Sequence, residues 1–413
     1  MLAFPMSDGG CEHLATVVGR LSFSLLLLLP WLLAMEQGST KKQHSQQPEG
    51  KSNIHVYVRV RPLSNEEIAQ GEKFSVQLSR DEQSIKVLDR GYSSSSIAFQ
   101  FDGCIGPTVG QEEMMQKLRL QKLLNKVLEG YSSTVMAYGQ TGSGKTFTMS
   151  GRQEFLQASN NLKSPTDGLI ARAVTYLFGA TKSQSTENNP KSFTIKASYF
   201  EVYNEQVNDL LRLNCAPREV KWSPNEGFYV ADLLLVECEM VDDVFSVLDE
   251  GAKNRKMGSH NLNKDSSRSH CVMTLHMDSH WKLDDGPTII RHGRMIFVDL
   301  AGSERLKKTK SSGDMLKETG NINRSLFTLG KVISALAEGK RKDVIPYRES
   351  TLTKLLMESL GGSSLALMIA CISPALSAID ETMSTLHYAS CTKTIVNLPL
   401  VNMDEKDKVL RLA

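Results

Sequence analysis

Apolar and polar residues alternate with two different periods along this chain, and each period predicts one kind of element. In residues 54–60 apolar side chains occupy every second position, the pattern of a strand buried on one side. In residues 111–129 they recur every three or four positions, as on one face of a helix, and Gly130 ends the pattern. The same patterns, together with short apolar runs, predict further strands at residues 97–101, 134–137, 193–202, 271–277, 295–300 and 365–372, and further helices at residues 168–181, 241–257, 321–337, 350–360 and 381–396.

The order of these elements predicts the fold class. Strands and helices alternate from residue 54 to residue 396, which indicates an α/β fold with a central, mostly parallel or mixed sheet and helices on both faces. A length of 413 residues allows two or three domains, but one large sheet of this kind accounts for residues 53–392 as a single domain. Residues 37–52 are polar and without periodicity, so we expect a flexible lead-in there.

An apolar run at residues 21–35 does not fit this domain. It is short for a membrane-spanning helix and is interrupted by Pro30, but it has the length of the apolar part of a signal peptide. Asp8 and Glu12 precede it, which is unusual for a signal peptide. The leader alone leaves secretion or membrane anchoring open, and it also leaves open a start of translation at Met35, with residues 1–34 an addition to the working protein.

Charge and cysteine content limit which cellular compartment and which binding partners fit this chain. Lys and Arg number 48 and Asp and Glu 46, so the net charge of +2 provides no global field that would drive binding to an acidic polymer. We therefore expect no nucleic-acid partner, and any acidic partner must be held by local groups of cations. The seven cysteines are odd in number and scattered, without a CxxC pair, which is typical of a reducing, intracellular compartment.

One segment has the spacing of a phosphate-binding loop. Residues 139–146, GQTGSGKT, match G-x-x-x-x-G-K-[ST], follow a predicted buried strand and precede a helix. Glycines let successive backbone N–H groups point at phosphate oxygens. Lys145 is predicted to reach the β- and γ-phosphates of a nucleotide, and the Thr146 hydroxyl to bind Mg²⁺. The α/β fold is thus predicted to be that of a P-loop NTPase.

Two further segments have the character of the loops that surround such a site. Residues 295–300 form an apolar run that presents Asp299 at its end, as a Walker-B strand presents its acid, and the N–H of Gly302 follows where it could meet a γ-phosphate. Residues 263–270, NKDSSRSH, are dense in hydroxyl groups and lack apolar periodicity. Alone they predict a polar surface loop, but their position between the other two segments is typical of a nucleotide-sensing loop.

Together these three segments resemble the P-loop, switch I and switch II of the kinesin motor domain, in order and in separation. Further similar segments are VRVRP at residues 58–62, SYFEVYNEQVNDLL at 198–211, NINRSLFTLGKVISAL at 321–336, PYR at 346–348 and SLGG at 359–362. The resemblance spans residues 54–402, and residues 221–222 and 227–230 are similar to the subfamily of kinesin family member twelve. It implies an ATPase whose cycle is coupled to microtubule binding.

The resemblance implies that ATP or ADP and Mg²⁺ bind along this loop. Arg59, Arg61 and Pro62 would frame the base, with two aromatic side chains close by. The metal would be bound by Thr146 and Ser267 directly and by Asp299 through a water. The implied nucleotide-binding residues are Arg59, Arg61, Pro62, Tyr138, Gly139, Gln140, Thr141, Gly142, Ser143, Gly144, Lys145, Thr146 and Phe147.

The switch residues are implied in the same way. Ser266 would position the attacking water, and Gly302 would sense the γ-phosphate. Arg268 and Glu304 would form a salt bridge that closes the two switches and relays a proton. The implied switch residues are Asn263, Ser266, Ser267, Arg268, Asp299, Gly302 and Glu304. Catalysis would then consist mainly of positioning and charge stabilisation.

The implied partner is the microtubule, built from tubulin, and the cations that would face this acidic filament follow switch II. Each of them alone is typical of a solvated surface charge, but as a set they favour binding. They are Lys307, Lys308, Lys310, Lys340, Arg341, Lys342, Arg348 and Lys354. The chain also departs from the family here, because Thr351 stands at a usual lysine position, Lys310 at a usual glycine and His387 at a usual basic residue.

Residues 393–402 resemble the neck linker, with Lys393 and Ile395 near its start and Asn402 at its latch position. A neck linker on the C-terminal side of the motor domain implies plus-end-directed movement. Pro399 lacks an N–H, so we expect it to weaken docking of this segment. Residues 403–413 would begin a neck helix that is cut off by the end of the chain, and dimerisation is expected through a stalk outside this chain.

Three functions therefore remain open on the sequence. The first is a microtubule-stimulated motor ATPase of the cytoplasm and cytoskeleton, with no membrane partner. The second, motivated by Thr351 and Pro399, is a non-processive microtubule-binding regulator with slow ATPase. The third, motivated by the apolar leader alone, is a secreted or membrane-anchored protein.

Overall fold

The computed structural model describes residues 50–404, except residues 89–95, 152–163, 187–188, 213–214, 225, 263–265, 283–287 and 305–313. The apolar run at residues 21–35 and residues 405–413 of the predicted neck helix lie outside these ranges. Within them, no helix combines the length and the apolar character that crossing a membrane requires.

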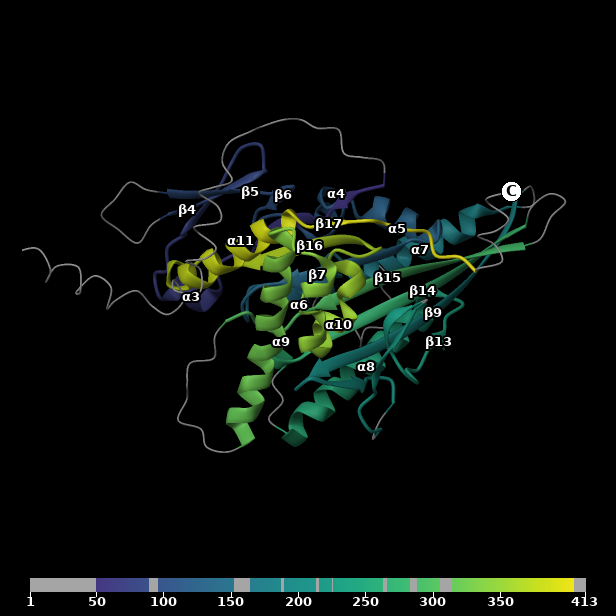
Figure 1. Ribbon diagram of the computed structural model, residues 1–413. Coiled ribbons are helices and arrows are strands. Elements are labelled where there is room, and N and C mark those ends of the chain that lie inside the picture. Colours follow the sequence, from purple (N-terminus) through teal and green to yellow (C-terminus); the bar gives the residue numbers. More distant parts are fainter. Residues whose placement is uncertain are drawn as a thin grey trace, which may run out of the picture. The chain divides into compact units, whose positions relative to one another are not determined.

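A mixed sheet forms the centre of the described domain (Figure 1). Five neighbouring strands are mutually parallel, in the order β15-β7-β16-β2-β6, and an antiparallel extension continues from β15 through β14 and β9 to β10. The strands are β2 (His55–Val60), β6 (Gly103–Ile105), β7 (Ser132–Tyr138), β9 (Asn189–Tyr203), β10 (Gln206–Asp209), β14 (His270–Lys282), β15 (Thr288–Asp299) and β16 (Leu365–Ile372), with β8 (Ser185–Thr186) and β13 (Val236–Glu237) paired to β9. The predicted α/β class and mixed sheet are confirmed.

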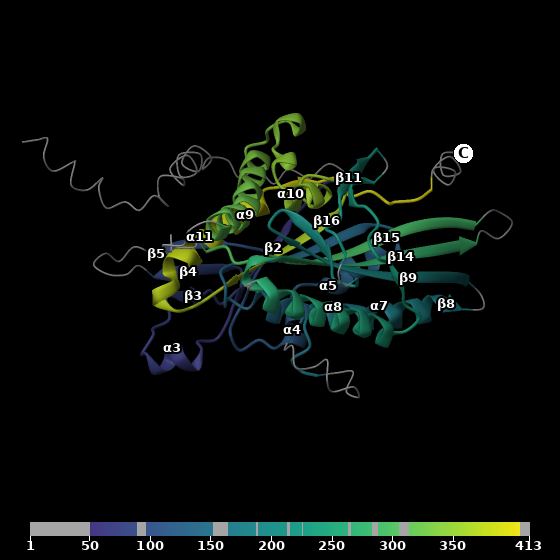
Figure 2. The same cartoon turned by 90° about the horizontal axis from the view of Figure 1, so that it is seen from below.

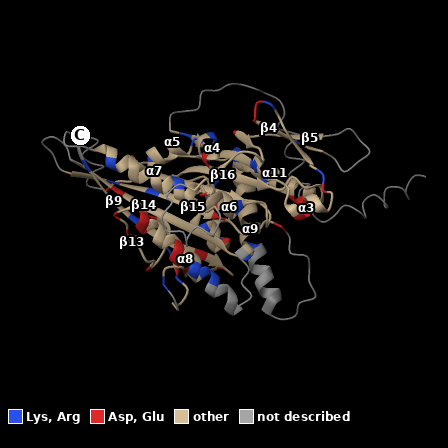
Figure 3. Cartoon of the chain, turned by 180° about the vertical axis from the view of Figure 1, so that it is seen from behind, with Lys and Arg blue, Asp and Glu red and all other residues tan. Residues whose placement is uncertain are grey.

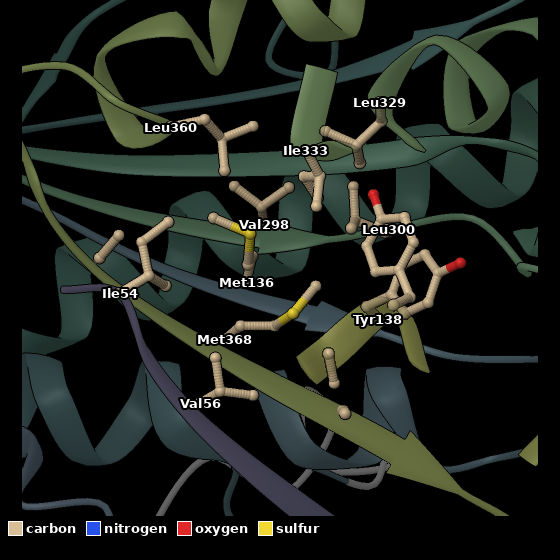
Figure 4. Packing of buried hydrophobic residues seen from close by; sticks show 14 of the residues in the cluster. Ile54, Val56, Met136, Tyr138, Val298, Leu300, Leu329, Ile333, Leu360 and Met368 are labelled. Atoms are coloured by element: carbon tan, nitrogen blue, oxygen red, sulfur yellow. The ribbon is translucent and has the colours of Figure 1, made fainter. Parts of the chain in front are cut away.

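Helices cover both faces of this sheet, as Figures 1 and 2 show. One face carries α4 (Gln111–Lys117), α5 (Leu120–Leu128), α7 (Leu169–Gln184) and α8 (Val241–Leu262), and the other carries α9 (Asp314–Ala337), α10 (Thr351–Leu355) and α11 (Ile379–Lys393). Side chains of β7 point alternately to the two faces of the sheet, because successive residues of a strand point to opposite sides. Met136 and Tyr138 join the cluster with Leu329 and Ile333 of α9 (Figure 4), whereas Val135 and Ala137 join the cluster under α5 and α7.

Three small sheets lie outside this main sheet. The sequence patterns predicted the third strand of the first one but missed all the others, because these strands are short and mostly half exposed. They are β3 (Val76–Leu78), β4 (Ser84–Leu88) and β5 (Ser96–Gln100); β11 (Val220–Ser223) and β12 (Gly227–Val230); and β1 (Ser52–Asn53) with β17 (Val396–Asn397). The remaining helices are the short α3 (Asn65–Ala69) and α6 (Lys145–Met149).

Two predicted helices differ from the structure. The helix expected at residues 111–129 is two helices, α4 and α5, because Arg119 adopts a left-handed conformation with φ 52° and ψ 35°. The flanking Leu118 and Leu120 are both buried, so the apolar pattern continues across the break and hides it. The helix expected at residues 350–360 is only the five-residue α10, followed by a 3₁₀ turn at Met357–Ser359.

Candidate nucleotide site

The glycine-rich loop joins the C-terminal end of β7 to α6, at the carboxyl edge of the parallel strands. Gly139 has a φ of 147°, and a Cβ there would lie 2.0 Å from the backbone oxygen of Cys371 in β16. Gly144, with a φ of 97°, directly precedes α6. Other residues at these two positions would be strained or would clash, so glycine determines the path of the loop.

Lys145 lies under this loop. It is the first residue of α6, is 7% exposed, and its Nζ donates a hydrogen bond to the backbone oxygen of Gln140 at 2.8 Å. Burial lowers the pKa of the ammonium, and the charge of Asp299 opposes that shift. An ammonium has three N–H donors, so phosphate oxygens can join Gln140 as acceptors around it.

Thr146 of the P-loop and Asp299 at the end of β15 lie far apart in sequence, but the fold brings their side-chain oxygens together. Thr146 Oγ1 donates to Asp299 Oδ2 at 2.6 Å, and burial raises the pKa of Asp299 while this hydrogen bond lowers it. Asp299 Oδ1 and Ser143 Oγ of the P-loop are buried without a hydrogen-bond partner in the described structure. Buried polar atoms require partners, so these oxygens fit a hard cation and a phosphate.

No group of three or more His, Cys, Asp or Glu side chains in the described ranges could hold a metal ion by itself. Thr146 and Asp299 are therefore a partial ligand set. Mg²⁺ suits such a set, because it is usually bound by one or two protein oxygens together with substrate phosphates and waters.

The loops predicted as switch I and switch II meet beside the P-loop. The N–H of Gly302 donates to the backbone oxygen of Ser267 at 2.9 Å, and the N–H of Ser303 donates to that of Gly139 at 3.1 Å. A Cβ at Gly302 would lie 2.3 Å from Thr141 Oγ1, so only glycine fits this contact without a shift. Asn263 lies outside the described residues, as does the side chain of Ser266.

Glu304 contacts the P-loop in this structure. Its carboxylate accepts hydrogen bonds from the N–H of Thr141 at 2.7 Å and from the Thr141 hydroxyl. Arg268 also has an interaction in this structure. The pairing of Arg268 with Glu304 stays a prediction.

His270, at the end of the switch I segment, was not assigned a role from the sequence. Its ring is 2% exposed; Nδ1 accepts from the N–H of Ala301 at 2.9 Å, and Nε2 lies 2.8 Å from Ser325 Oγ in α9. Because Nδ1 accepts, the neutral ring carries its proton on Nε2 and donates to Ser325. Burial lowers the pKa of His270 to about 3, and the charges of Lys145 and Arg255 lower it further. The ring thus connects the switch II loop to α9.

The residues predicted to frame the base lie in two places. Arg59 is buried; its Nη1 donates to Gln111 Oε1 at 3.0 Å and to Thr148 Oγ1 at 2.7 Å, and its guanidinium lies 5.3 Å from the ring centroid of Phe147. The ring of Phe147 is 38% exposed, so it offers a surface beside the P-loop helix. Arg61 forms a bidentate ion pair with Glu67.

Tyr138 does not join this group. Its ring stacks on Tyr388 of α11 at 4.0 Å between centroids and is buried in the cluster on the α9 and α11 face (Figure 4). Arg59 lies on the opposite face of the sheet, because it alternates along β2 with Val58 and Val60 of the Tyr138 cluster. The structure therefore does not support a place for the Tyr138 ring beside the base.

The described basic residues of the implied filament face follow α9. Lys340, Arg341 and Arg348 are exposed, and Lys354 lies in α10. Lys340 pairs with Glu338 at 2.7 Å and Arg341 with Asp343 at 2.9 Å, which reduces the local positive charge. Basic and acidic positions are also interspersed over the elements visible in Figure 3.

The side chains of four predicted cations of the implied filament face lie outside the described residues, and His387 differs from the expected basic residue. Lys307, Lys308, Lys310 and the side chain of Lys342 lie outside the described residues. The ring of His387 packs edge-on against Phe99 at 4.9 Å, and burial lowers its pKa, so His387 does not replace the usual basic charge at neutral pH.

Lys393 ends α11 and Thr394 still has a helical backbone, so the extended part of residues 393–402 begins later, with β17 at Val396–Asn397. The N–H groups of Leu398 and Leu400 donate to Gly362 and Ser363, and Asn402 donates through its own N–H to Gly130 at 2.9 Å. Pro399 lies between the donors Leu398 and Leu400, at a position whose N–H would not face these partners. Its missing N–H therefore removes none of these hydrogen bonds. The expectation that Pro399 weakens docking is therefore corrected.

Two asparagines hold this segment in place. Asn402 Nδ2 lies within hydrogen-bond distance of the oxygens of Ser132, His292 and Gly130, at 3.0, 3.2 and 3.3 Å. Asn397, which the sequence reasoning did not single out, is 1% exposed and donates to two backbone oxygens while its Oδ1 accepts from Gly361. Only the burial of Asn397 distinguishes it from an ordinary polar residue of a loop.

This arrangement defines a P-loop nucleotide-binding protein with an α/β fold, in which two loops contact the phosphate-binding loop. The kinesin motor domain family model matches residues 59–395. The chain belongs to the kinesin family.

Curated relatives agree with this assignment. The chain is 40% identical over 356 residues to the human chromosome-associated kinesin KIF4B, covering 85% of this chain and 27% of that protein. It is 38% identical to kinesin-like protein klp-20 of Caenorhabditis elegans (88% of this chain, 54% of that protein) and 37% identical to kinesin-like protein KIF12 of Mus musculus (88% and 56%). The chain thus spans between about a quarter and just over half of the length of these relatives.

A solved structure of a fast kinesin has the same fold. It superimposes with a TM-score of 0.76 at 34% sequence identity, covering 86% of this chain and 94% of that chain.

Proposed function

We propose that this chain is a motor ATPase that hydrolyses MgATP at its P-loop and two switch loops and couples hydrolysis to microtubule binding. The observation that carries this proposal is the meeting of the three segments at one place: Thr146 contacts Asp299 at 2.6 Å, and Gly302 contacts Ser267 at 2.9 Å. A phosphate-binding lysine, oxygen ligands for a metal and a glycine N–H beside the phosphate-binding loop are parts that phosphoryl transfer to water uses.

In this mechanism the protein positions groups and stabilises charge. Lys145 and the N–H groups of the loop would bind the phosphates, and the N–H of Gly302, which here donates to Ser267, would turn to the γ-phosphate. Thr146, Ser267 and, through a water, Asp299 would hold Mg²⁺, which neutralises charge on the phosphates. Ser266 would orient the attacking water. Arg268 would replace Thr141 as the partner of Glu304 when the switches close, since Thr141 now holds that carboxylate.

The segment at residues 393–402 would carry the output of this cycle. Its hydrogen bonds to Gly130, Gly362 and Ser363 support a docked neck linker, and its place after the motor domain supports plus-end-directed movement. We further propose a cytoplasmic, microtubule-associated location and dimerisation through segments outside this chain.

Steady-state ATPase with and without microtubules tests this function. We expect turnover to rise at least tenfold on addition of microtubules, and surface-bound protein to move filaments in a gliding assay. No stimulation would reject the proposed coupling. Stimulated turnover without filament movement would instead favour a non-processive regulator with slow ATPase.

That second candidate rests on Thr351, which stands at a usual cation position. In the structure Thr351 donates to Glu205 through its N–H at 2.6 Å and through its hydroxyl at 2.8 Å, so the residue anchors the start of α10 and adds no charge.

We predict that Thr351→Lys tightens microtubule binding by about fivefold, because one added surface cation contributes about 1 kcal/mol against an acidic filament at low salt. Co-sedimentation at fixed ionic strength measures the affinity. Thr351→Val is the matched control, since it removes the hydroxyl without adding charge. Equal affinities for all three proteins would place Thr351 outside the interface.

A further inference from the structure

A cavity lies apart from the nucleotide site. It has a volume of about 540 Å³, within the range of small-molecule sites, and shares no residue with the P-loop or the switches. Its lining comes from β2, β16, the residue before β4, β5 and the β5–β6 connection, the junction of α4 and α5, and the end of α11. It lies on the face of the sheet to which Tyr57 points.

The floor of this cavity is apolar and its rim is cationic. Five buried side chains form the floor: Tyr57, Phe101, Leu118, Leu123 and Leu367. Four cations line it, namely Lys117, Arg119, Lys122 and Lys393, against the single carboxylate of Asp102. An apolar floor below several cations is complementary to an organic anion.

The existing contacts neutralise only part of this charge. Lys117 pairs with Glu82 and lies 3.6 Å from Glu113, and Asp102 accepts from the N–H of Val56. Among the described residues, neither Arg119 nor Lys122 has a carboxylate within 4 Å. Two cations from one helix junction thus remain at the cavity without an acidic partner.

The backbone of Arg119 is a second, independent observation. Its left-handed conformation costs about 1 kcal/mol for a residue with a Cβ, and glycine or asparagine would relieve this strain. The chain has arginine instead, at the break between α4 and α5, and this arginine lines the cavity. Strain that persists at a cavity is typical of a ligand site.

We propose that this cavity binds a small organic anion that has an apolar ring system and carries a phosphate, sulfonate or carboxylate group. The ring system would lie on the floor at Tyr57 and Leu123, and the anionic group would pair with Arg119 and Lys122. Lys393 ends α11 directly before the neck linker, and its backbone oxygen accepts from Asn53 of β1 at 3.2 Å. A bound anion would therefore contact the residue from which the neck linker begins.

Two fluorescent probes test the proposal on the whole chain in saturating MgADP. The anion 8-anilinonaphthalene-1-sulfonate is expected to bind at least tenfold more tightly than its neutral counterpart N-phenyl-1-naphthylamine. In the double variant Arg119→Gly, Lys122→Gln we expect that preference to fall to below threefold. Glycine suits the left-handed backbone, so this variant is expected to keep the wild-type melting temperature.

Lys126→Gln together with Lys253→Gln is the matched control, because these lysines lie on α5 and α8 but do not line the cavity. We expect wild-type probe binding in this control. Because MgADP fills the P-loop throughout, the outcome is separate from that of the nucleotide site. An equal preference for the anionic probe in the wild type and the cavity variant would overturn the proposal, as would the absence of any preference in the wild type.

Discussion

Replacement of Lys145 by alanine is expected to abolish productive nucleotide binding. The buried ammonium contributes charge-assisted hydrogen bonds to the phosphates, each worth about 1.5–3 kcal/mol. We therefore expect ATP affinity to fall by at least about 100-fold, or about 2.7 kcal/mol, and ATPase to become undetectable. Binding of a fluorescent ATP analogue and steady-state turnover measure the two effects.

Two controls accompany this prediction. Lys253→Ala removes an exposed lysine that pairs with Asp249 on α8, and should leave affinity and turnover unchanged. Lys145→Arg retains the positive charge, but the larger guanidinium group has to fit in a buried position. We therefore expect partial ATPase activity. Normal turnover in Lys145→Ala would mean that the nucleotide site lies elsewhere.

Loss of the His270 ring is expected to lower the free energy of unfolding by about 3 kcal/mol. The ring satisfies the buried N–H of Ala301 and contacts Ser325, so His270→Ala leaves an unpaired donor and a cavity. Because the same ring connects the switch II loop to α9, we also expect microtubule-stimulated turnover to fall at least tenfold. Urea unfolding and ATPase assays test the two parts.

His270→Asn is the informative control, since its side-chain oxygen can replace Nδ1 as the acceptor for Ala301. We expect it to recover part of the stability, whereas His270→Gln, which cannot place its oxygen there, should resemble the alanine variant. Equal stabilities of wild type and His270→Ala would contradict the assigned contacts.

The pH dependence of stability follows from the same contacts. Burial lowers the pKa of His270 to about 3, below the ordinary value of 6.5, so the folded state holds the ring neutral. The stabilisation is complete above pH 6.5 and is lost as the pH falls from 6.5 toward 3, by up to about 1.4 kcal/mol per pH unit. The difference in unfolding free energy between wild type and His270→Asn should therefore narrow between pH 6.5 and pH 4.5. A constant difference would show that the folded ring is not held neutral.

The sequence predicted the nucleotide site better than its surroundings. Lys145, Thr146 and Asp299 belong to segments with a strict spacing, and the structure brings them together as expected. The resemblance to the kinesin motor domain placed Tyr138 near the base. Its ring points to the other face of the sheet, since neighbouring residues of a strand alternate.

Backbone geometry explains why two further sequence predictions, at Arg119 and Pro399, differ from the structure. The pattern of buried leucines continues through Arg119, so periodicity could not show that α4 and α5 are separate helices. Pro399 was expected to remove a hydrogen bond, but which N–H groups of an extended segment face their partner depends on register. Asn397 and His270 are polar residues whose importance comes from hydrogen bonds that they make where they are buried.

The amino-acid sequence alone establishes an α/β kinesin-type chain with a phosphate-binding loop, because glycine spacing, strand runs and a terminal aspartate are local properties. The order of the strands, the tautomer of His270, the partner of Glu304 and the cationic cavity at Arg119 emerge only in the folded chain. Each of them depends on groups far apart in sequence that packing brings within a few ångströms, as the pairing of β2 with β16 across 300 residues illustrates. The net charge of +2 likewise conceals where cations gather, since only the folded chain brings Lys117, Arg119, Lys122 and Lys393 to one rim.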